Sequence, residues 1–121
     1  GEIHILAFHE TNGTTEQLAV LPLSIADDCC NLMLETPPLM LIRSGHNNRI
    51  QLLWPERRDF AVEENEYFAF LDENRLYTTV WYKDPDYREE LLVRDYDTGE
   101  LLERIPGSLR QMPDGQKWLL V

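Results

Sequence analysis

Tight-turn signals recur along the whole chain and separate short apolar segments, and this feature constrains the fold more than any other. Asn-Gly favours a hairpin turn because both central residues need positive φ, and Asp-Thr-Gly suits a type I turn that ends in a left-handed glycine. Short segments between such turns predict antiparallel β-hairpins. The expected turns are Asn12-Gly13, Ser44–Asn48, Asp72–Asn74, Asp97–Gly99 and Pro113–Gly115.

The sequence therefore predicts a mainly β fold, an antiparallel, hairpin-rich sandwich or barrel that occupies residues 1–121 as a single domain. One segment departs from the pattern. Ser24 precedes Asp27 at N-cap spacing, and the apolar residues that follow recur with a helical period. We expect at most one short helix, at residues 25–33, with a strand at Leu32–Leu34 as the alternative.

The hairpin predicted at Leu91–Gly107 has two partial copies earlier in the chain. Leu41–Pro55 matches it at a separation of 51 residues (106 − 55), and a looser copy runs from Ile3 to Pro22. In each copy a proline closes the second arm, where a missing backbone donor marks the end or edge of a strand.

The residues from Leu91 to Val121 resemble the blade repeat of β-propellers, in the broad tryptophan–aspartate and quinoprotein-like group. In those blades a strand ends in Asp, a D-x-T-G turn follows, and P-D-G-x-x-L opens the next strand. The matching residues here are Asp95, Asp97, Thr98, Gly99, Pro113, Asp114, Gly115, Trp118 and Leu119.

The length of the chain limits what this resemblance implies. A blade has four strands and a closed propeller has at least about four blades, whereas this chain has room for about three. The chain could be part of a larger propeller, copies could assemble around an axis, or a sandwich or barrel could use similar turns. We favour the last interpretation, and the sequence leaves the oligomeric state open.

The chain is strongly acidic, with 22 Asp and Glu residues against 11 Lys and Arg residues and a net charge of −11. Such a surface repels phosphates and anionic lipid heads, so we expect no nucleic-acid or membrane partner and favour a basic protein partner. Alternatively, the acidity only keeps the domain soluble. No signal peptide is recognised, and Cys29 and Cys30 are adjacent and have no other cysteine to pair with, which favours a cytoplasmic protein.

The sequence contains no recognisable catalytic constellation, phosphate loop or dinucleotide fingerprint. His4 and His9 lie five positions apart and would point to opposite faces of a strand. Cys29-Cys30 lacks the usual C-x-x-C spacing. We therefore predict no catalytic residue, no metal site and no cofactor, and favour a binding domain over an enzyme.

The predicted partner surface lies between Tyr67 and Glu90, where aromatic and acidic residues alternate. Aromatic side chains anchor protein contacts, and exposed acids steer a basic partner. The anchors would be Trp81, Tyr82 and Tyr87, with a charged rim of Asp84, Asp86, Glu89 and Glu90. The other acidic runs, Glu63-Glu64-Glu66 and Asp72-Glu73, are also expected to be exposed.

The function expected from these features is that of a non-catalytic, acidic binding domain that engages another protein. One alternative is an inhibitor or immunity-type protein that neutralises a basic nucleic-acid enzyme by presenting acids where phosphates would lie. The other is a small-molecule-binding β-barrel, which would need a deep apolar pocket with convergent polar groups.

Overall fold

The computed structural model describes residues 1–22, 32–35 and 39–121, and every regular element among them is a β-strand. The prediction of a mainly β, antiparallel and hairpin-rich fold is confirmed. The strands are β1 (Glu2–His9), β2 (Thr14–Pro22), β3 (Leu32–Glu35), β4 (Met40–His46), β5 (Arg49–Trp54), β6 (Arg58–Ala61), β7 (Glu66–Asp72), β8 (Arg75–Tyr82), β9 (Arg88–Asp95), β10 (Leu101–Pro106), β11 (Ser108–Gln111) and β12 (Lys117–Leu120).

The chain divides into two compact units, residues 1–30 and 31–121. In the first unit, β1 and β2 form an antiparallel hairpin with a β-bulge beside Ile5 and Leu6. The second unit contains all the other described strands. The single-domain organisation stays a prediction.

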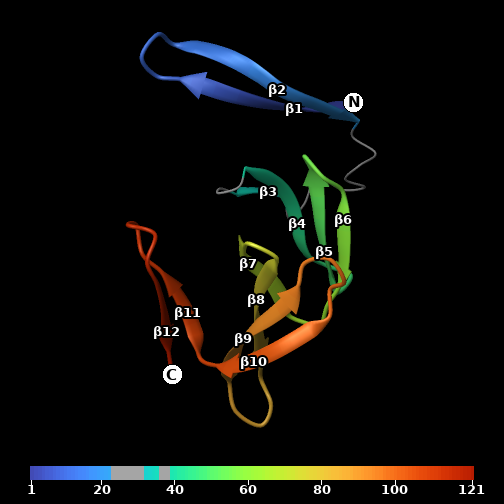
Figure 1. The fold of residues 1–121 in the computed structure, drawn as a ribbon, viewed down its shortest axis with the longest axis vertical. Helices are drawn as coiled ribbons and strands as arrows, with labels where there is room; N and C mark the ends of the chain where they lie inside the picture. The colour runs from blue at the N-terminus through green and yellow to red at the C-terminus, as the bar shows by residue number, and fades with distance from the viewer. Residues whose placement is uncertain (23–31, 36–38) are drawn as a thin grey trace. The chain divides into compact units, whose positions relative to one another are not determined.

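The second unit is built from successive antiparallel meanders (Figure 1). One sheet has the order β3-β4-β5-β6, the next has the order β7-β8-β9-β10, and β11 pairs with β12 alone. Each of these sheets is open, and none of the described strands closes a barrel. A four-stranded meander is also the unit of a propeller blade, so the strand order matches the propeller-like alternative.

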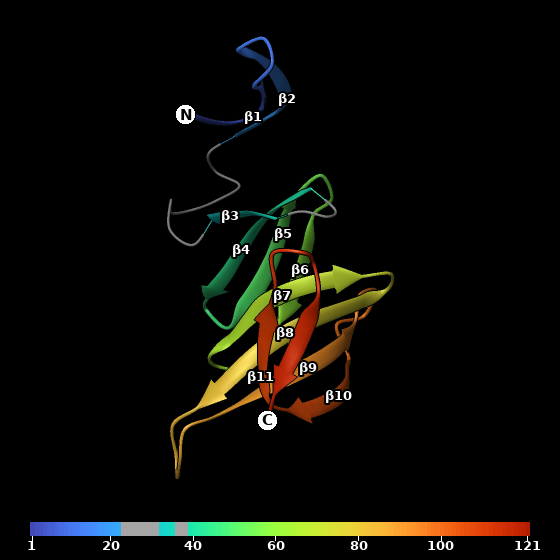
Figure 2. The ribbon, with the colours of Figure 1, turned by 90° about the vertical axis from the view of Figure 1, so that its left-hand side faces the viewer.

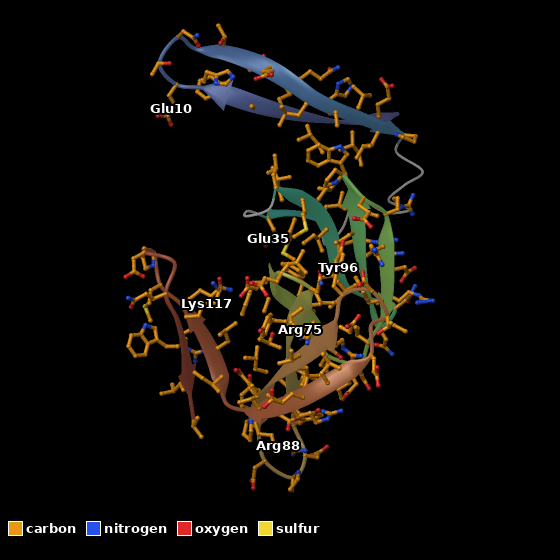
Figure 3. The ribbon with its side chains drawn as sticks, in the orientation of Figure 1. Glu10, Glu35, Arg75, Arg88, Tyr96 and Lys117 are labelled. Atoms are coloured by element: carbon orange, nitrogen blue, oxygen red, sulfur yellow. The ribbon has the colours of Figure 1, made fainter. Side chains whose placement is uncertain are left out.

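The first strands of the three sheets border the same hollow, which has a volume of about 340 Å³. Glu35 comes from β3, the segment Phe68–Asp72 from β7, and Gln111 from β11. Lys117 of β12 also lines the hollow, and Figure 3 labels it together with Glu35. The three sheets therefore succeed one another around a common space.

The main core lies between the two four-stranded sheets. Its buried side chains come from β4, β5, β6 and β8, and partly buried residues of β7 pack against them. The buried Ser44 adds a polar link, because its Oγ accepts a hydrogen bond of 2.9 Å from the Phe68 backbone N–H of β7. The core residues are Met40, Ile42, Ile50, Leu52, Phe60 and Leu76.

A buried ion pair crosses the sheet of β7, β8 and β9. Arg94 donates to both carboxylate oxygens of Glu66 at 2.8 and 2.9 Å, and these residues are only 7% and 2% exposed. The Thr78 hydroxyl and the Glu63 backbone N–H donate two further hydrogen bonds to the carboxylate, at 2.6 and 2.8 Å. Arg94 also donates to the Gly99 carbonyl at 3.0 Å. These bonds satisfy the buried carboxylate fully.

The expectation that Glu66 belongs to an exposed acidic run is wrong. The run precedes a strand, and Glu66 begins β7 with its side chain directed into the sheet interior, where Arg94 neutralises it. A charged residue is buried only when it is paired and hydrogen-bonded, and the required arginine lies 28 positions away along the chain.

The predicted hairpins form, but the 51-residue repeat is not the repeat of the sheets. Leu41–Pro55 covers β4 and β5, the second and third strands of their sheet, whereas Leu91–Gly107 covers β9 and β10, the third and fourth. The first strands begin at Leu32, Glu66 and Ser108, so the sheet period is 34 (66 − 32) and then 42 (108 − 66) residues. Similar turn chemistry at non-equivalent turns produced the apparent match.

The turns show the backbone conformations that their residues favour. Asn47 and Asn48 both have positive φ, 53° and 55°, as a two-residue hairpin turn requires. Gly99 has φ 77° after Asp97-Thr98, and Asp95 Oδ1 accepts the backbone N–H groups of Asp97 and Thr98 at 2.9 and 3.0 Å.

The predicted helix at residues 25–33 lies mostly outside the described residues, and its last two positions are in a strand. Leu32 and Met33 belong to β3, which pairs with β4, as in the alternative prediction of a strand at Leu32–Leu34. In the described parts of the chain, no helix has the length and apolar character needed to cross a membrane.

We expect Arg94→Ala to lower the free energy of unfolding by about 3–5 kcal/mol, because it leaves the Glu66 carboxylate buried without its counter-charge. Chemical denaturation measures this change. The control is Arg75→Ala, which removes an exposed pair with Asp95 (3.7 Å) and should cost less than about 1 kcal/mol. Equal losses for the two variants would contradict the assigned role of the buried pair.

Gly107, which links β10 to β11, should tolerate alanine less well than Gly115. A Cβ at Gly107 would lie 2.6 Å from Leu119 Cγ, whereas nothing lies within 4 Å of a Cβ at Gly115. Both glycines have positive φ, so both variants carry backbone strain. In chemical denaturation, Gly107→Ala should therefore lose about 1–3 kcal/mol more than Gly115→Ala; no difference would mean that β12 does not pack against this link.

Candidate functional site

The predicted partner-binding residues surround the connection between β8 and β9. Tyr82 ends β8, Arg88 begins β9, and residues 83–87 form a loop that projects beyond the end of the sheet (Figure 2). The pairing of Trp81 with Glu89 and of Tyr82 with Arg88 fixes the register at the base of the loop. Figure 3 labels Arg88 at this end of the hairpin.

Two of the three predicted anchors form an aromatic pair. The rings of Trp81 and Tyr87 stack with their centroids 6.5 Å apart and their planes at 22°. Tyr87 is 65% exposed, and Trp81 is half-buried. A stacked pair presents a rigid apolar surface with little side-chain entropy to lose on binding, so these two side chains fit the role of anchors.

The third predicted anchor, Tyr82, has a different environment. Its hydroxyl accepts a hydrogen bond from Arg104 Nη1 at 2.9 Å and donates one to Glu63 Oε1 at 3.2 Å. The Arg88 guanidinium lies over its ring, 4.4 Å from the centroid. Partial burial raises the pKa of Tyr82. Through these contacts Tyr82 connects the Glu63 and Arg104 side chains at the border of the site.

Arg104 of β10 contacts Glu63, Tyr82 and Glu90, and the sequence analysis did not predict a role for it. It forms ion pairs with Glu63 and with Glu90, the latter at 3.2 Å. The hydrogen bond with Glu63 raises the pKa of Arg104 above its ordinary value. In a four-stranded meander the end of the fourth strand lies near the loop between the second and third, so an assumed strand order could have indicated this arginine.

The four predicted acids fall into two groups. Glu90 pairs with Arg104, and Glu89 accepts a hydrogen bond of 2.5 Å from the Tyr87 hydroxyl. Hydrogen bonds from the Ser108 and Tyr87 hydroxyls lower the pKa of Glu89. Asp84 and Asp86 are exposed, and within the described part of the chain their carboxylates have no ion-pair or hydrogen-bond partner. Only this second group is available to a partner.

A hollow of about 500 Å³ lies beside the aromatic pair, between the β6–β7 loop and the end of β8. The two elements are joined by a backbone hydrogen bond of 3.4 Å from Trp81 N–H to the Asn65 carbonyl. Glu64 adds an exposed carboxylate that, among the described residues, has no partner. The lining residues are Glu63, Glu64, Asn65, Trp81, Tyr82, Lys83 and Asp84, with three acids against one lysine.

A second hollow, of about 350 Å³, lies on the other side of the aromatic pair. Tyr87 and Glu89 contribute to it from one sheet, and Arg110 and Leu120 from the β11–β12 hairpin. Trp81 lines the hollow of about 500 Å³ and Tyr87 lines the hollow of about 350 Å³, so the stacked rings form the ridge between these two hollows.

Other parts of the chain show less chemical organisation. A small apolar cavity of about 220 Å³ is lined by Trp54, Leu71 and Tyr96 among others, and it is smaller than typical ligand pockets. His4 and His9 lie on the exposed β1 strand, where they contact Gln17 and Glu16, at 3.2 and 3.3 Å. The described residues include no cluster of three or more His, Cys, Asp or Glu side chains arranged for a metal ion. Cys29 and Cys30 lie outside the described residues.

Comparison of the chain with protein-family models, with curated proteins and with solved structures finds no match.

Because the folded state lowers the pKa of Glu89, the carboxylate stabilises the protein above its unfolded-state pKa, and this contribution disappears as pH falls through the folded-state pKa. Ser108→Ala removes the largest cause, so it should raise the pKa of Glu89 towards the ordinary value of about 4.3. NMR titration of the side-chain carboxyl measures the shift. The pKa of Asp95, lowered mainly by the Thr98 backbone N–H, should not move; an unchanged Glu89 titration would rule out the contact with Ser108.

Proposed function

We propose that the chain is a non-catalytic protein-binding domain that holds a basic segment of another protein at the end of the β8–β9 hairpin. The observation that carries this proposal is the stacked pair of half-buried Trp81 and exposed Tyr87, beside a hollow whose Glu64 and Asp84 carboxylates have no partner among the described residues. The aromatic rings would supply contact area, and the carboxylates would supply charge complementarity.

A basic partner fits the local balance of charge as well as the net charge of −11. Glu64, Asp84 and Asp86, which have no partner in the described part of the chain, lie in the loops next to Trp81 and Tyr87, whereas Glu63 and Glu90 are engaged with Arg104. A lysine or arginine of the partner could lie in the hollow without breaking these internal pairs. We also propose that the chain is a single domain and lies in the cytoplasm, as expected from its sequence.

The test begins with a display library of short random peptides selected on the wild-type protein. We expect the selected peptides to be enriched in Lys and Arg and to bind more weakly as salt concentration rises. Glu64→Lys, Asp84→Lys and Asp86→Lys together should weaken the best peptide by at least about tenfold, which corresponds to about 1.4 kcal/mol. The matched control reverses Glu73, Glu100 and Glu103, which are exposed and change the net charge equally.

The aromatic contribution is tested in the same binding assay. Tyr87→Ala should weaken the selected peptide by about 2 kcal/mol or more if Tyr87 is an anchor, whereas Tyr67→Ala, at an exposed tyrosine of β7, should not. Selected peptides without basic residues, or equal losses for the two charge-reversed triple variants, would remove the β8–β9 end as the binding site.

A further inference from the structure

The hollow of about 340 Å³ that β3, β7 and β11 border has the composition of a small-molecule pocket, and we call it the three-sheet hollow. Its volume lies within the range of about 300–1,000 Å³ that is usual for ligand pockets. Apolar side chains of β4 and β7 line it, and its larger polar side chains are those of Glu35, Asp72, Gln111 and Lys117. It shares no lining residue with the two hollows at the end of the β8–β9 hairpin.

One wall of the three-sheet hollow is an aromatic stack. The rings of Phe70 and Tyr77, from the paired strands β7 and β8, lie with their centroids 4.2 Å apart and their planes at 10°. Lys117 Nζ lies 4.6 Å from the centre of the Phe70 ring, and Gln111 Nε2 donates a hydrogen bond of 3.5 Å to the Ala69 carbonyl. These contacts connect the β11–β12 hairpin to β7 and hold the ammonium group of Lys117 at the border of the hollow.

The charged groups that line the three-sheet hollow have opposite signs but do not pair with one another. The carboxylates of Glu35 and Asp72 have no ion-pair or hydrogen-bond partner in the described part of the chain. Lys117 contacts the Phe70 ring and, among the described residues, no carboxylate. Figure 3 labels Glu35 and Lys117. A molecule with both an ammonium and a carboxylate group would satisfy both signs of charge at once.

The apolar part of the three-sheet hollow adjoins a second cavity. Met40 and Leu71 line both this hollow and the apolar cavity of about 220 Å³ that Trp54 and Tyr96 also line. Methionine has three rotatable bonds and adapts its shape to its neighbours. A change of the Met40 rotamer would therefore enlarge the space available to an apolar group, and burial of such a group against these side chains is favourable.

We propose that the three-sheet hollow binds a free, zwitterionic amino acid with an apolar side chain. Glu35 and Asp72 accept hydrogen bonds from its ammonium group, and Lys117 donates to its carboxylate. Its side chain packs against Met40 and Leu71. A molecule that carries only one of the two charged groups leaves the groups of opposite role without a partner. This site is separate from the proposed peptide-binding function and does not depend on it.

NMR titration with L-phenylalanine tests the site, because the ring of the ligand shifts the signals of nearby methyl groups. The chain has three methionines, Met33, Met40 and Met112, so labelling of their methyl groups with ¹³C gives three signals, which single Met→Leu variants assign. Only Met40 lines the hollow, and we expect only its signal to shift. The shift should approach saturation at about 10 mM ligand, as for a Kd of about 1 mM.

Two analogues test the requirement for both charged groups. Phenethylamine lacks the carboxylate, and 3-phenylpropionate lacks the ammonium group. Each should bind at least about tenfold more weakly than L-phenylalanine, because each loses hydrogen bonds in which both partners are charged. Binding of either analogue as tightly as L-phenylalanine would overturn the assignment of a zwitterionic ligand.

Charge-removing variants test the two ends of the hollow separately. Glu35→Gln with Asp72→Asn should weaken L-phenylalanine at least about tenfold, but should not weaken 3-phenylpropionate, which has no ammonium group. Lys117→Gln should weaken L-phenylalanine by a similar factor, but should not weaken phenethylamine, which has no carboxylate. A variant that had only lost its fold would weaken every ligand, so the retained binding of one analogue distinguishes the two cases.

Matched controls remove the same charges elsewhere. Glu100→Gln with Glu103→Gln removes two exposed carboxylates, and Lys83→Gln changes the other lysine of the chain; none of these residues lines the three-sheet hollow. These controls should bind L-phenylalanine as the wild-type protein does. Equal losses for the controls and for the variants of the hollow would overturn the proposal.

An unshifted Met40 signal at about 10 mM L-phenylalanine would also overturn the proposal, since it would exclude a Kd of about 1 mM. Equal shifts of all three methionine signals would overturn it as well, because they would indicate contact with the whole surface. Glu35, Asp72 and Lys117 do not line the hollows beside Trp81 and Tyr87. The amino-acid site and the peptide-binding site therefore fail independently.

Discussion

The buried pair of Glu66 and Arg94 determines much of the architecture of the second unit. A carboxylate at this depth requires a counter-charge and hydrogen bonds for its remaining lone pairs. Arg94, Thr78 and the Glu63 backbone N–H provide them, which fixes β7, β8 and β9 in one register. Because Arg94 also bonds to the Gly99 carbonyl, the turn after β9 is held by the same group of interactions.

This arrangement also positions the candidate binding site. The hydrogen bond from Glu63 N–H to Glu66 holds the β6–β7 loop at the start of its strand, and Glu63 then reaches Arg104 and Tyr82. Glu63 therefore connects the residues that line the acidic hollow with the buried pair of Glu66 and Arg94. The loop after β8 depends less on the core, because its contacts are mainly those of Trp81 with Tyr87 and of Arg88 with the Asp84 carbonyl.

Local turn chemistry explains which parts of the fold could be predicted from the sequence. Asn47-Asn48 and Asp97–Gly99 adopt the conformations that their residues favour, so the hairpins were correct. The position of a hairpin within a sheet depends on long-range pairing, and turn residues carry no information about it. The 51-residue match therefore linked hairpins that occupy different positions in their sheets.

The same distinction applies to the site. Trp81 and Tyr87, which the sequence predicted as anchors, lie at the two ends of a single short loop and stack. The sequence did not separate Asp84 and Asp86, which have no partner in the described structure, from Glu89 and Glu90, because the partner of Glu90 is Arg104, on the next strand. Burial of Glu66 also depended on a distant arginine. The signs of the charges were visible in the sequence, but their pairing required the strand order.

The position of Lys83 has a consequence for selectivity. Its ammonium group lies 5.9 Å from the centre of the Trp81 ring, on the border of the acidic hollow. In the proposed function, a cation of the partner that used this ring face would compete with Lys83. A solitary lysine would gain little from the exchange, whereas a segment that also contacts Tyr87 would gain enough area to complete it. Under the proposed function, such competition would favour a composite basic and apolar sequence over an isolated charge.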